Sequence, residues 1–180
     1  MAASEGTPPV LPVHIRPEAP ADITEIHHVL TAAFGRPQEA ALVAALRREG
    51  VPTLSLVAVH ASQVVGHLLL SPVIIKSSAE SFPALGLGPL AVSPPYQRKG
   101  IGEALVRAGL EYCLPEGHEI VLLVGHPDYY ARFGFAPAAG FGLTCEFPVP
   151  ESFFLALELR PGALQGTRGL VFYHPQFHSV

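Results

Sequence analysis

The stretch that decides the fold is LGPLAVSPPYQRKGIGEALVRAGLEYC, residues 87–113. It opens with an apolar run that ends at Val92, continues through a loop with glycines at positions 100 and 102, and closes with a helix-forming run. A strand, a glycine loop and a helix in this order direct several unpaired backbone N–H groups toward one point. The stretch therefore predicts an anion site where the loop enters the helix.

The residue types in this loop indicate a phosphate group as the anion. Gly100 and Gly102 let a phosphate approach the backbone closely, and Arg98 and Lys99 add positive charge around it. A simpler alternative is a solvated loop whose glycines only mark the start of the helix. Other phosphate motifs fit badly, because Leu105 stands where a dinucleotide fingerprint has its third glycine, and no GxxxxGK[ST] motif occurs.

The composition of the chain limits the class of protein. It has 180 residues, of which 49% are hydrophobic and 14% are charged, enough for one compact domain with a core and too few for two. We therefore expect a flexible tail over residues 1–10 and a single domain over residues 11–180. Lys and Arg number 11 and Asp and Glu number 15, and the resulting formal charge of −4 argues against nucleic acid as a partner.

Sequence features also indicate the compartment. Cys113 and Cys145 have neither metal-like nor redox-like spacing, and two cysteines make no disulfide framework. Residues 1–10 lack the basic and apolar regions of a signal peptide, and the apolar run at residues 64–75 is interrupted by a histidine, a serine and a proline. We expect a cytoplasmic protein without a membrane span.

Hydrophobic periodicity gives the order of elements. Two-residue alternation or short apolar runs predict strands at 13–17, 54–60, 63–75, 84–92, 120–124, 153–159 and 170–174. Helical spacing and the terminating glycines or prolines predict helices at 21–34, 38–50, 100–114 and 128–135. This order predicts an α/β fold, with a mixed sheet and helices on both of its faces.

Two motifs in this order resemble the GNAT superfamily of acyl-CoA-dependent N-acyltransferases. Gln97 with Gly100 and Gly102 satisfies the family signature [QR]-x-x-G-x-[GA] after a strand, and YYARFGF at 129–135 is similar to the family's Tyr-x-x-x-Gly-Phe pattern. Two further segments also look like the bacterial YhbS-like branch of the family: residues 84–92 and FFLALELRPGAL at 153–164. The resemblance implies a mixed, mostly antiparallel sheet whose central strands, 84–92 and 120–124, splay apart.

The resemblance also implies acetyl-CoA as the cosubstrate and assigns residues to it. The pyrophosphate would rest on the loop, Gln97, Arg98, Lys99, Gly100, Ile101 and Gly102. The pantetheine arm would lie along the strand, Leu90, Ala91 and Val92, and the N–H of Val92 would donate to the developing oxyanion. We expect no metal ion, since the histidines lack ligand spacing on one helix face.

The family's catalytic acid corresponds to Tyr130, which would protonate the departing thiolate; the alternative is a core aromatic residue. Tyr129 beside it is interpreted as a packing residue. The general base stays open between His67 and His126, for each of which a structural role is the alternative. This chain departs from the family twice: residues 84–92 contain no glutamate, and the asparagine that often follows the next strand is absent, with His126 or Asp128 in its place.

The function expected from this resemblance is transfer of an acetyl group from acetyl-CoA to a primary amine, by direct attack in a ternary complex, in a monomer or homodimer. Arg36 could hold a carboxylate of the acceptor, and an apolar acceptor pocket could be walled by Phe34, Phe141, Phe153 and Phe154. The main alternative is a non-catalytic acyl-CoA-binding sensor or scaffold, which would not require Tyr130. A nucleic-acid-binding domain fits the net charge poorly. The sequence does not name the amine or the base.

Overall fold

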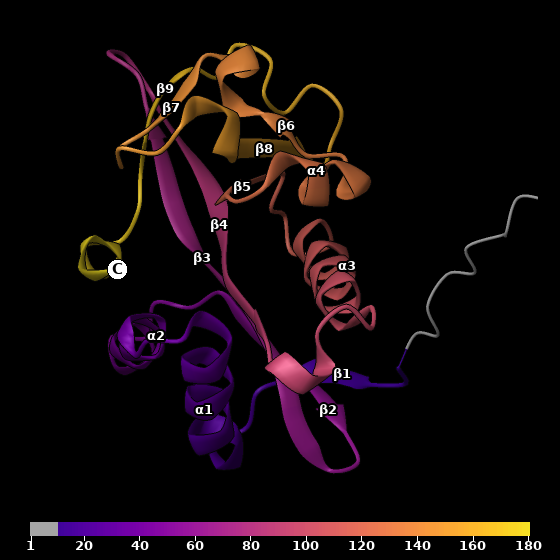
Figure 1. Cartoon of the computed structure of the whole chain (residues 1–180). Helices are drawn as coiled ribbons and strands as arrows, with labels where there is room; N and C mark the ends of the chain where they lie inside the picture. Colours follow the sequence, from indigo (N-terminus) through magenta and orange to yellow (C-terminus); the bar gives the residue numbers. More distant parts are fainter. Residues whose placement is uncertain (1–10) are drawn as a thin grey trace, which may run out of the picture.

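The apolar runs of the chain pair into one nine-stranded sheet in the computed structural model, which describes residues 11–180 (Figure 1). The main path of the sheet has the order β1-β2-β3-β4-β5-β8-β6, and β9 pairs with both β3 and β7. The strands are β1 His14–Pro17, β2 Leu54–His60, β3 Gln63–Lys76, β4 Ser81–Val92, β5 Ile120–Val124, β6 Ala136–Pro137, β7 Leu143–Cys145, β8 Phe154–Glu158 and β9 Gly169–Phe172. The tail expected over residues 1–10 lies outside the described residues.

Helices cover both faces of this sheet, as the sequence predicts. They are α1 Ile23–Phe34, α2 Gln38–Arg48, α3 Ile101–Cys113 and α4 Pro127–Tyr130. In Figure 1, α3 lies on one side of the long pair β3 and β4, while α1 and α2 lie on the other side. A side chain at Gly109 would approach Leu68 to 2.8 Å, so this glycine lets α3 lie close against β3.

The pairing of β4 decides where the sheet opens. Toward β3 the ladder is antiparallel over most of the strand, with one extra residue of β4 inserted between Leu87 and Leu90. Toward β5 the ladder is parallel and comprises only Leu85 with Val121 and Gly86 with Leu122. Beyond these pairs the two central strands separate, which confirms the predicted splay in a mostly antiparallel sheet.

The predicted elements are confirmed, with shifted ends and two omissions. β4 begins at Ser81 because its first residues pair with the end of β3. The helix predicted at 128–135 is shorter: α4 ends at Tyr130, and a 3₁₀ turn follows it over Ala131–Phe133. The strands β6 and β7 were not predicted, because two or three residues are too few to show alternation.

Candidate functional site

A pocket of about 580 Å³ lies where β4, the loop after it and the start of α3 meet. We call it the loop pocket. It is lined by Leu90, Val92, Tyr96, Gln97, Arg98, Gly100, Ile101, Gly102, Glu103, Tyr129 and Arg132. Seven of the nine residues that the sequence predicts for the cosubstrate are therefore gathered around one cavity, and the exceptions are Ala91 and Lys99.

The two exceptions have simple geometric reasons. Ala91 alternates with Leu90 and Val92 along β4, so its side chain lies on the opposite face, buried among residues of α1 and α2. Lys99 is exposed, and its ammonium group lies 5.7 Å from the centre of the Tyr96 ring. Its carbonyl oxygen accepts a hydrogen bond from the N–H of Leu11, 3.1 Å away.

The start of α3 presents free backbone donors to the loop pocket. Gly100 is the residue before the helix and has φ of 81°, a left-handed conformation that glycine adopts without strain. No side chain caps this end of the helix. The amides of its first turn therefore lack a partner within the helix and are available to an anion. The side chain of Gln97 does not compete for them, because its Nε2 donates to the carbonyl oxygen of Val92 at 2.9 Å.

Gly102 leaves room that a side chain would occupy. A Cβ atom there would lie 2.9 Å from the hydroxyl oxygen of Tyr129 and 3.8 Å from Cγ2 of Val92. Tyr129 is thus part of the loop pocket, and its interpretation as a packing residue overlooked this position. The sequence offers no signal for it, since Tyr129 and Tyr130 are adjacent on a helix of only four residues.

The backbone N–H of Val92 faces the gap between β4 and β5. The next residue, Ser93, donates its N–H to the carbonyl oxygen of Val65 on β3, at 2.9 Å. Successive residues of a strand direct their N–H groups to opposite sides, so the N–H of Val92 is directed away from β3. An oxygen atom held in the gap can therefore accept a hydrogen bond from it.

A second cavity, of about 630 Å³, lies on the other side of this gap. We call it the apolar pocket. It is lined by Phe34, Arg36, Glu39, Leu42, Leu87, Gly88, Pro89, Leu90, Val124, Tyr130, Phe147, Pro148, Val149, Tyr173, Phe177 and Val180. Leu90 lines both cavities, and the rings of Tyr129 and Tyr130 meet edge to face with centroids 4.9 Å apart. The two pockets thus adjoin where the central strands separate.

Tyr130 presents a largely buried phenol at this junction. Its ring packs against Phe135, with centroids 5.8 Å apart, and against the backbone of Gly125. Burial raises the pKa of Tyr130 well above its ordinary value, and the neighbouring Tyr129 raises it further. The hydroxyl is therefore protonated throughout the neutral pH range and is available as a proton donor.

The two histidines considered as bases lie outside both pockets. The side chain of His67 is fully buried, and its Nε2 lies 2.9 Å from the hydroxyl of Ser55 and 3.7 Å from the Glu18 carboxylate. Burial lowers the pKa of His67, although Glu18 opposes this shift. The side chain of His126 is 62% exposed, and its Nδ1 lies 3.8 Å from the carboxylate of Asp128.

The residues expected to hold the acceptor are divided between cavities. Phe34 and Arg36 line the apolar pocket, and Phe154 lines a third cavity, which is described next. Phe141 and Phe153 line none of these three cavities. About half of the remaining apolar wall comes from the segments at 147–149 and 173–180, in which the sequence analysis named no acceptor residue. These segments carry no local pattern that would connect them with Phe34.

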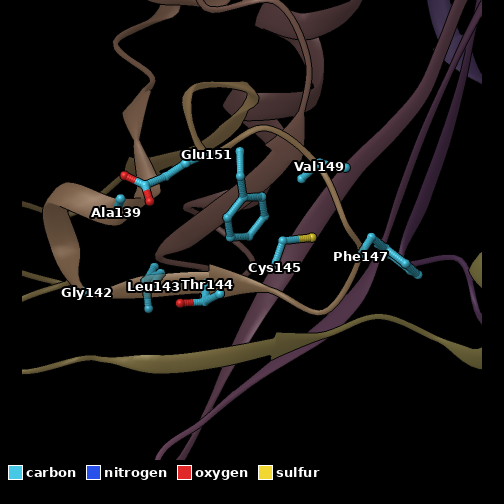
Figure 2. A pocket seen from close by; sticks show the side chains of 9 residues that line it. Ala139, Gly142, Leu143, Thr144, Cys145, Phe147, Val149 and Glu151 are labelled. Carbon is cyan, nitrogen blue, oxygen red and sulfur yellow. The ribbon is translucent and has the colours of Figure 1, made fainter.

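The third cavity has a volume of about 490 Å³ and lies beside β7. Figure 2 shows Cys145 and Glu151 among the side chains around it, and Phe147 and Val149 at its edge also line the apolar pocket. Burial raises the pKa of the Cys145 thiol, so the group is a weak nucleophile here. Nothing in this cavity resembles the anion-binding geometry of the loop pocket.

Two further kinds of feature are absent from residues 11–180. No three His, Cys, Asp or Glu side chains gather there in a way that could hold a metal ion. None of the helices in that range has the length and apolar character needed to cross a membrane. The loop pocket and the apolar pocket therefore remain the features of chemical interest.

Comparison with known proteins supports the resemblance. A family profile described as "Acetyltransferase (GNAT) domain" matches residues 14–138. The Escherichia coli K12 protein named "Uncharacterized N-acetyltransferase YhbS" is 39% identical over 165 residues, which cover 91% of this chain and 98% of that protein.

Solved structures agree over nearly the same range. The structure of YhbS from Escherichia coli in complex with CoA has a TM-score of 0.88 at 39% identity, over 97% of this chain and 96% of that one. A GNAT family acetyltransferase from Brucella melitensis in complex with acetyl-CoA has a TM-score of 0.76 at 36% identity, over 92% of this chain and 98% of that one. On its fold, its loop signature and these relatives, this chain belongs to the GNAT family of N-acetyltransferases.

Proposed function

We propose that this protein transfers an acetyl group from acetyl-CoA to a primary amine while both are bound. The observation that carries this proposal is the meeting of the loop pocket and the apolar pocket at Leu90, where β4 and β5 separate. A donor on one side of the gap and an acceptor on the other would place their reacting atoms together. Such positioning is a large part of catalysis when two substrates react.

The loop pocket fits acetyl-CoA. The uncapped amides at the start of α3 and the space above Gly102 suit a pyrophosphate, and Arg98 adds positive charge. Arg132 lies on the same wall, 3.5 Å from the carboxylate of Glu103. From there the gap between the strands leads along Leu90 and Val92 to the apolar pocket, a path that suits the pantetheine arm. The relatives solved with CoA and with acetyl-CoA support this assignment.

The residues at the junction have distinct roles in the proposed reaction. Acetyl-CoA supplies the thioester, whose acyl carbon becomes bonded to the amine nitrogen as its bond to sulfur breaks. The N–H of Val92 donates a hydrogen bond to the acyl oxygen and stabilises the charge that develops there. Tyr130 donates its proton to the departing sulfur. Burial raises the pKa of this phenol, which makes it a weaker acid, and burial raises the pKa of the departing thiol in the same way, so the transfer depends on the two groups meeting in the same buried junction.

The amine must lose a proton during the transfer. His67 is enclosed in the sheet with a lowered pKa, whereas His126 is open to solvent and lies two residues beyond Val124, which lines the apolar pocket. We assign the proton to His126 rather than to His67, through an intervening water molecule.

The first test of this function is a substitution at Gly102. The backbone of Gly102 is not in the left-handed region, so it accepts a side chain without backbone strain. The valine side chain of Gly102→Val would, however, fill the space beside Tyr129. We expect the affinity for acetyl-CoA, measured by calorimetry, to fall tenfold or more, about 1.4 kcal/mol. Release of free thiol in the presence of amines should fall in parallel at low acetyl-CoA concentration.

Gly140 provides the matched control. A Cβ atom there would meet nothing within 4 Å, so Gly140→Val should leave acetyl-CoA binding unchanged. Equal affinities of the two variants would exclude the loop pocket as the binding site. Acetyl-CoA binding without thiol release in the presence of any amine would favour the non-catalytic sensor instead.

A further inference from the structure

We infer that the acceptor is a primary amine carried on an uncharged, apolar body, and that polyamines and other polycations are poor acceptors. This inference rests on the proposed function and concerns the apolar pocket. A volume of about 630 Å³ is in the range of small-molecule sites. The chemistry of the wall then determines which amines bind there.

Exposed apolar side chains gather at this pocket from distant parts of the chain. Phe34 at the end of α1 is 40% exposed, Val124 at the end of β5 is 44% exposed, and Val180 is 46% exposed. All three line the apolar pocket. Large apolar side chains left open to water around one cavity indicate a surface that an apolar ligand covers.

The charged residues in the wall neutralise each other. The Nε of Arg36 donates to the carboxylate of Glu39 at 3.1 Å and 3.2 Å, and its Nη2 donates to the same group. The side chain of Glu39 is only 8% exposed, so its carboxylate is committed to this pair. They are the charged side chains among the lining residues, so the side chains of the wall carry no net charge.

A polycation would bind poorly in such a pocket. Each ammonium group that leaves water needs a carboxylate or several oxygen acceptors in exchange. Glu39 could serve a second cation only by releasing Arg36, whose charge would then oppose the incoming one. An amine on an apolar body needs no such exchange, because its single nitrogen reaches the junction near Tyr130 and the rest contacts apolar side chains.

The C-terminal side of this wall is held in place by contacts to two other segments. The carboxylate of Glu146 accepts a hydrogen bond from the N–H of Tyr173 at 2.5 Å, and the ring of Phe177 packs against Tyr173 with centroids 5.3 Å apart. Gln176 donates to the carboxylate of Glu49, just after α2, at 2.7 Å. Phe177 is therefore a fixed part of the pocket and a suitable residue to alter.

The test compares two amines at saturating acetyl-CoA. The probes are 2-phenylethylamine, which has an apolar body, and spermidine, which is a polycation. Free thiol release gives kcat/KM for each, and calorimetry with CoA present gives the binding of each amine. We expect kcat/KM for 2-phenylethylamine to exceed that for spermidine at least tenfold.

A variant pair locates the effect in the pocket. Phe177→Ala removes apolar wall and should raise KM for 2-phenylethylamine about fivefold to tenfold, with acetyl-CoA affinity unchanged. Leu114→Ala is the control, since Leu114 is 47% exposed at the end of α3 and does not line the pocket. It should leave KM unchanged.

The outcomes separate the inference from the function on which it rests. Equal or better transfer to spermidine would overturn the inference and leave the acetyltransferase function intact. Binding of 2-phenylethylamine that depends on Phe177, without thiol release, would support the pocket's preference and contradict the function. Absence of both binding and transfer for 2-phenylethylamine would contradict the inference.

Discussion

Tyr129 and Tyr130 are neighbours in the chain, yet they line different cavities. Tyr129 contributes its hydroxyl to the loop pocket beside Gly102, and Tyr130 lines the apolar pocket. Tyr130 was predicted from the Tyr-x-x-x-Gly-Phe pattern, which includes its spacing to Gly134. Tyr129 has no such pattern, and its position follows from the separation of β4 and β5, which a local sequence pattern cannot show.

The proton-donor role of Tyr130 leads to a prediction at this scale. Tyr130→Phe keeps the ring and removes the hydroxyl, so packing should persist while the departing sulfur loses its acid. We expect kcat to fall about 10² to 10⁴-fold, with the dissociation constant of acetyl-CoA nearly unchanged. Single-turnover kinetics and calorimetry measure the two quantities.

Tyr112→Phe is the control for this substitution, because Tyr112 lies on α3 and is 37% exposed. Its kcat should equal that of the unaltered protein. If Tyr130→Phe also transfers acetyl groups at the unaltered rate, the sulfur leaves as a thiolate held by backbone donors. If it loses acetyl-CoA binding or its fold, Tyr130 is a core aromatic residue.

The turn between β5 and α4 is the element that positions Tyr130. A Cβ atom at Gly125 would overlap Cε2 of the Tyr130 ring and lie 3.1 Å from Cδ1 of Leu123. Because the ring is packed on its other side against Phe135, it cannot move away freely. The small residue at the end of β5 is therefore a requirement of the site.

This close approach predicts the effect of Gly125→Ala. The added methyl group should displace the Tyr130 hydroxyl from the junction, and a displacement of about 1 Å can lower a rate by about 10²-fold. We expect kcat to fall at least tenfold and the free energy of unfolding to fall by about 1 to 3 kcal/mol. Steady-state kinetics and urea denaturation test this.

Gly140→Ala is the control for the extra methyl group, because a methyl group at position 140 would have no atom within 4 Å. It should change neither kcat nor stability beyond about 0.5 kcal/mol. A fully active Gly125→Ala protein would show that the ring adjusts without consequence for the reaction.

Elements differ in how well the sequence predicts them, and the reason is length. β3 and α3 are long enough for their apolar spacing to distinguish a strand from a helix. β6 and β7 are held by partners far away in the chain, so their two or three residues carry no signal of their own. The apolar pocket has the same origin, since its wall joins α1 with segments more than a hundred residues later.

At the scale of the whole molecule, one polar cluster joins four elements. The carboxylate of Glu18, just after β1, accepts hydrogen bonds from Arg47 on α2, at 2.7 Å and 2.9 Å, and from Ser55 on β2. Ser55 in turn contacts His67 on β3. Because Ser55 donates to Glu18, its oxygen accepts the proton of Nε2, while the buried Nδ1 of His67 has no hydrogen-bond partner.

Both titratable groups of this cluster make the fold sensitive to acid. Burial lowers the pKa of His67 below its ordinary 6.5. Burial alone would raise the pKa of Glu18, but the nearby His67 and the hydrogen bonds from Arg47 and Ser55 outweigh it and lower that pKa below 4.5. In both cases the unfolded chain binds the proton more tightly. The stabilisation is therefore present above pH 6.5 and is lost as the pH falls through 6.5 and then 4.5.

We therefore expect the free energy of unfolding to decrease as the pH falls from 7.5 to 5.5. The slope should be at most about 1.4 kcal/mol per pH unit, because His67 takes up one proton when the chain unfolds. Urea denaturation at several pH values measures this slope. His67→Gln should flatten the slope, because glutamine does not titrate in this range. His28→Gln, at an exposed position on α1, should leave it unchanged. An unaltered slope in His67→Gln would assign the acid sensitivity to other groups.

The placement of the tyrosines has an optical consequence. The chain contains no tryptophan, so its intrinsic ultraviolet emission comes from five tyrosines. Tyr96 and Tyr129 line the loop pocket, Tyr130 and Tyr173 line the apolar pocket, and only Tyr112 lies away from both. The tyrosine fluorescence of the protein is therefore a label-free reporter of ligands that enter either pocket. The emission of Tyr112 is the part that does not come from a pocket residue.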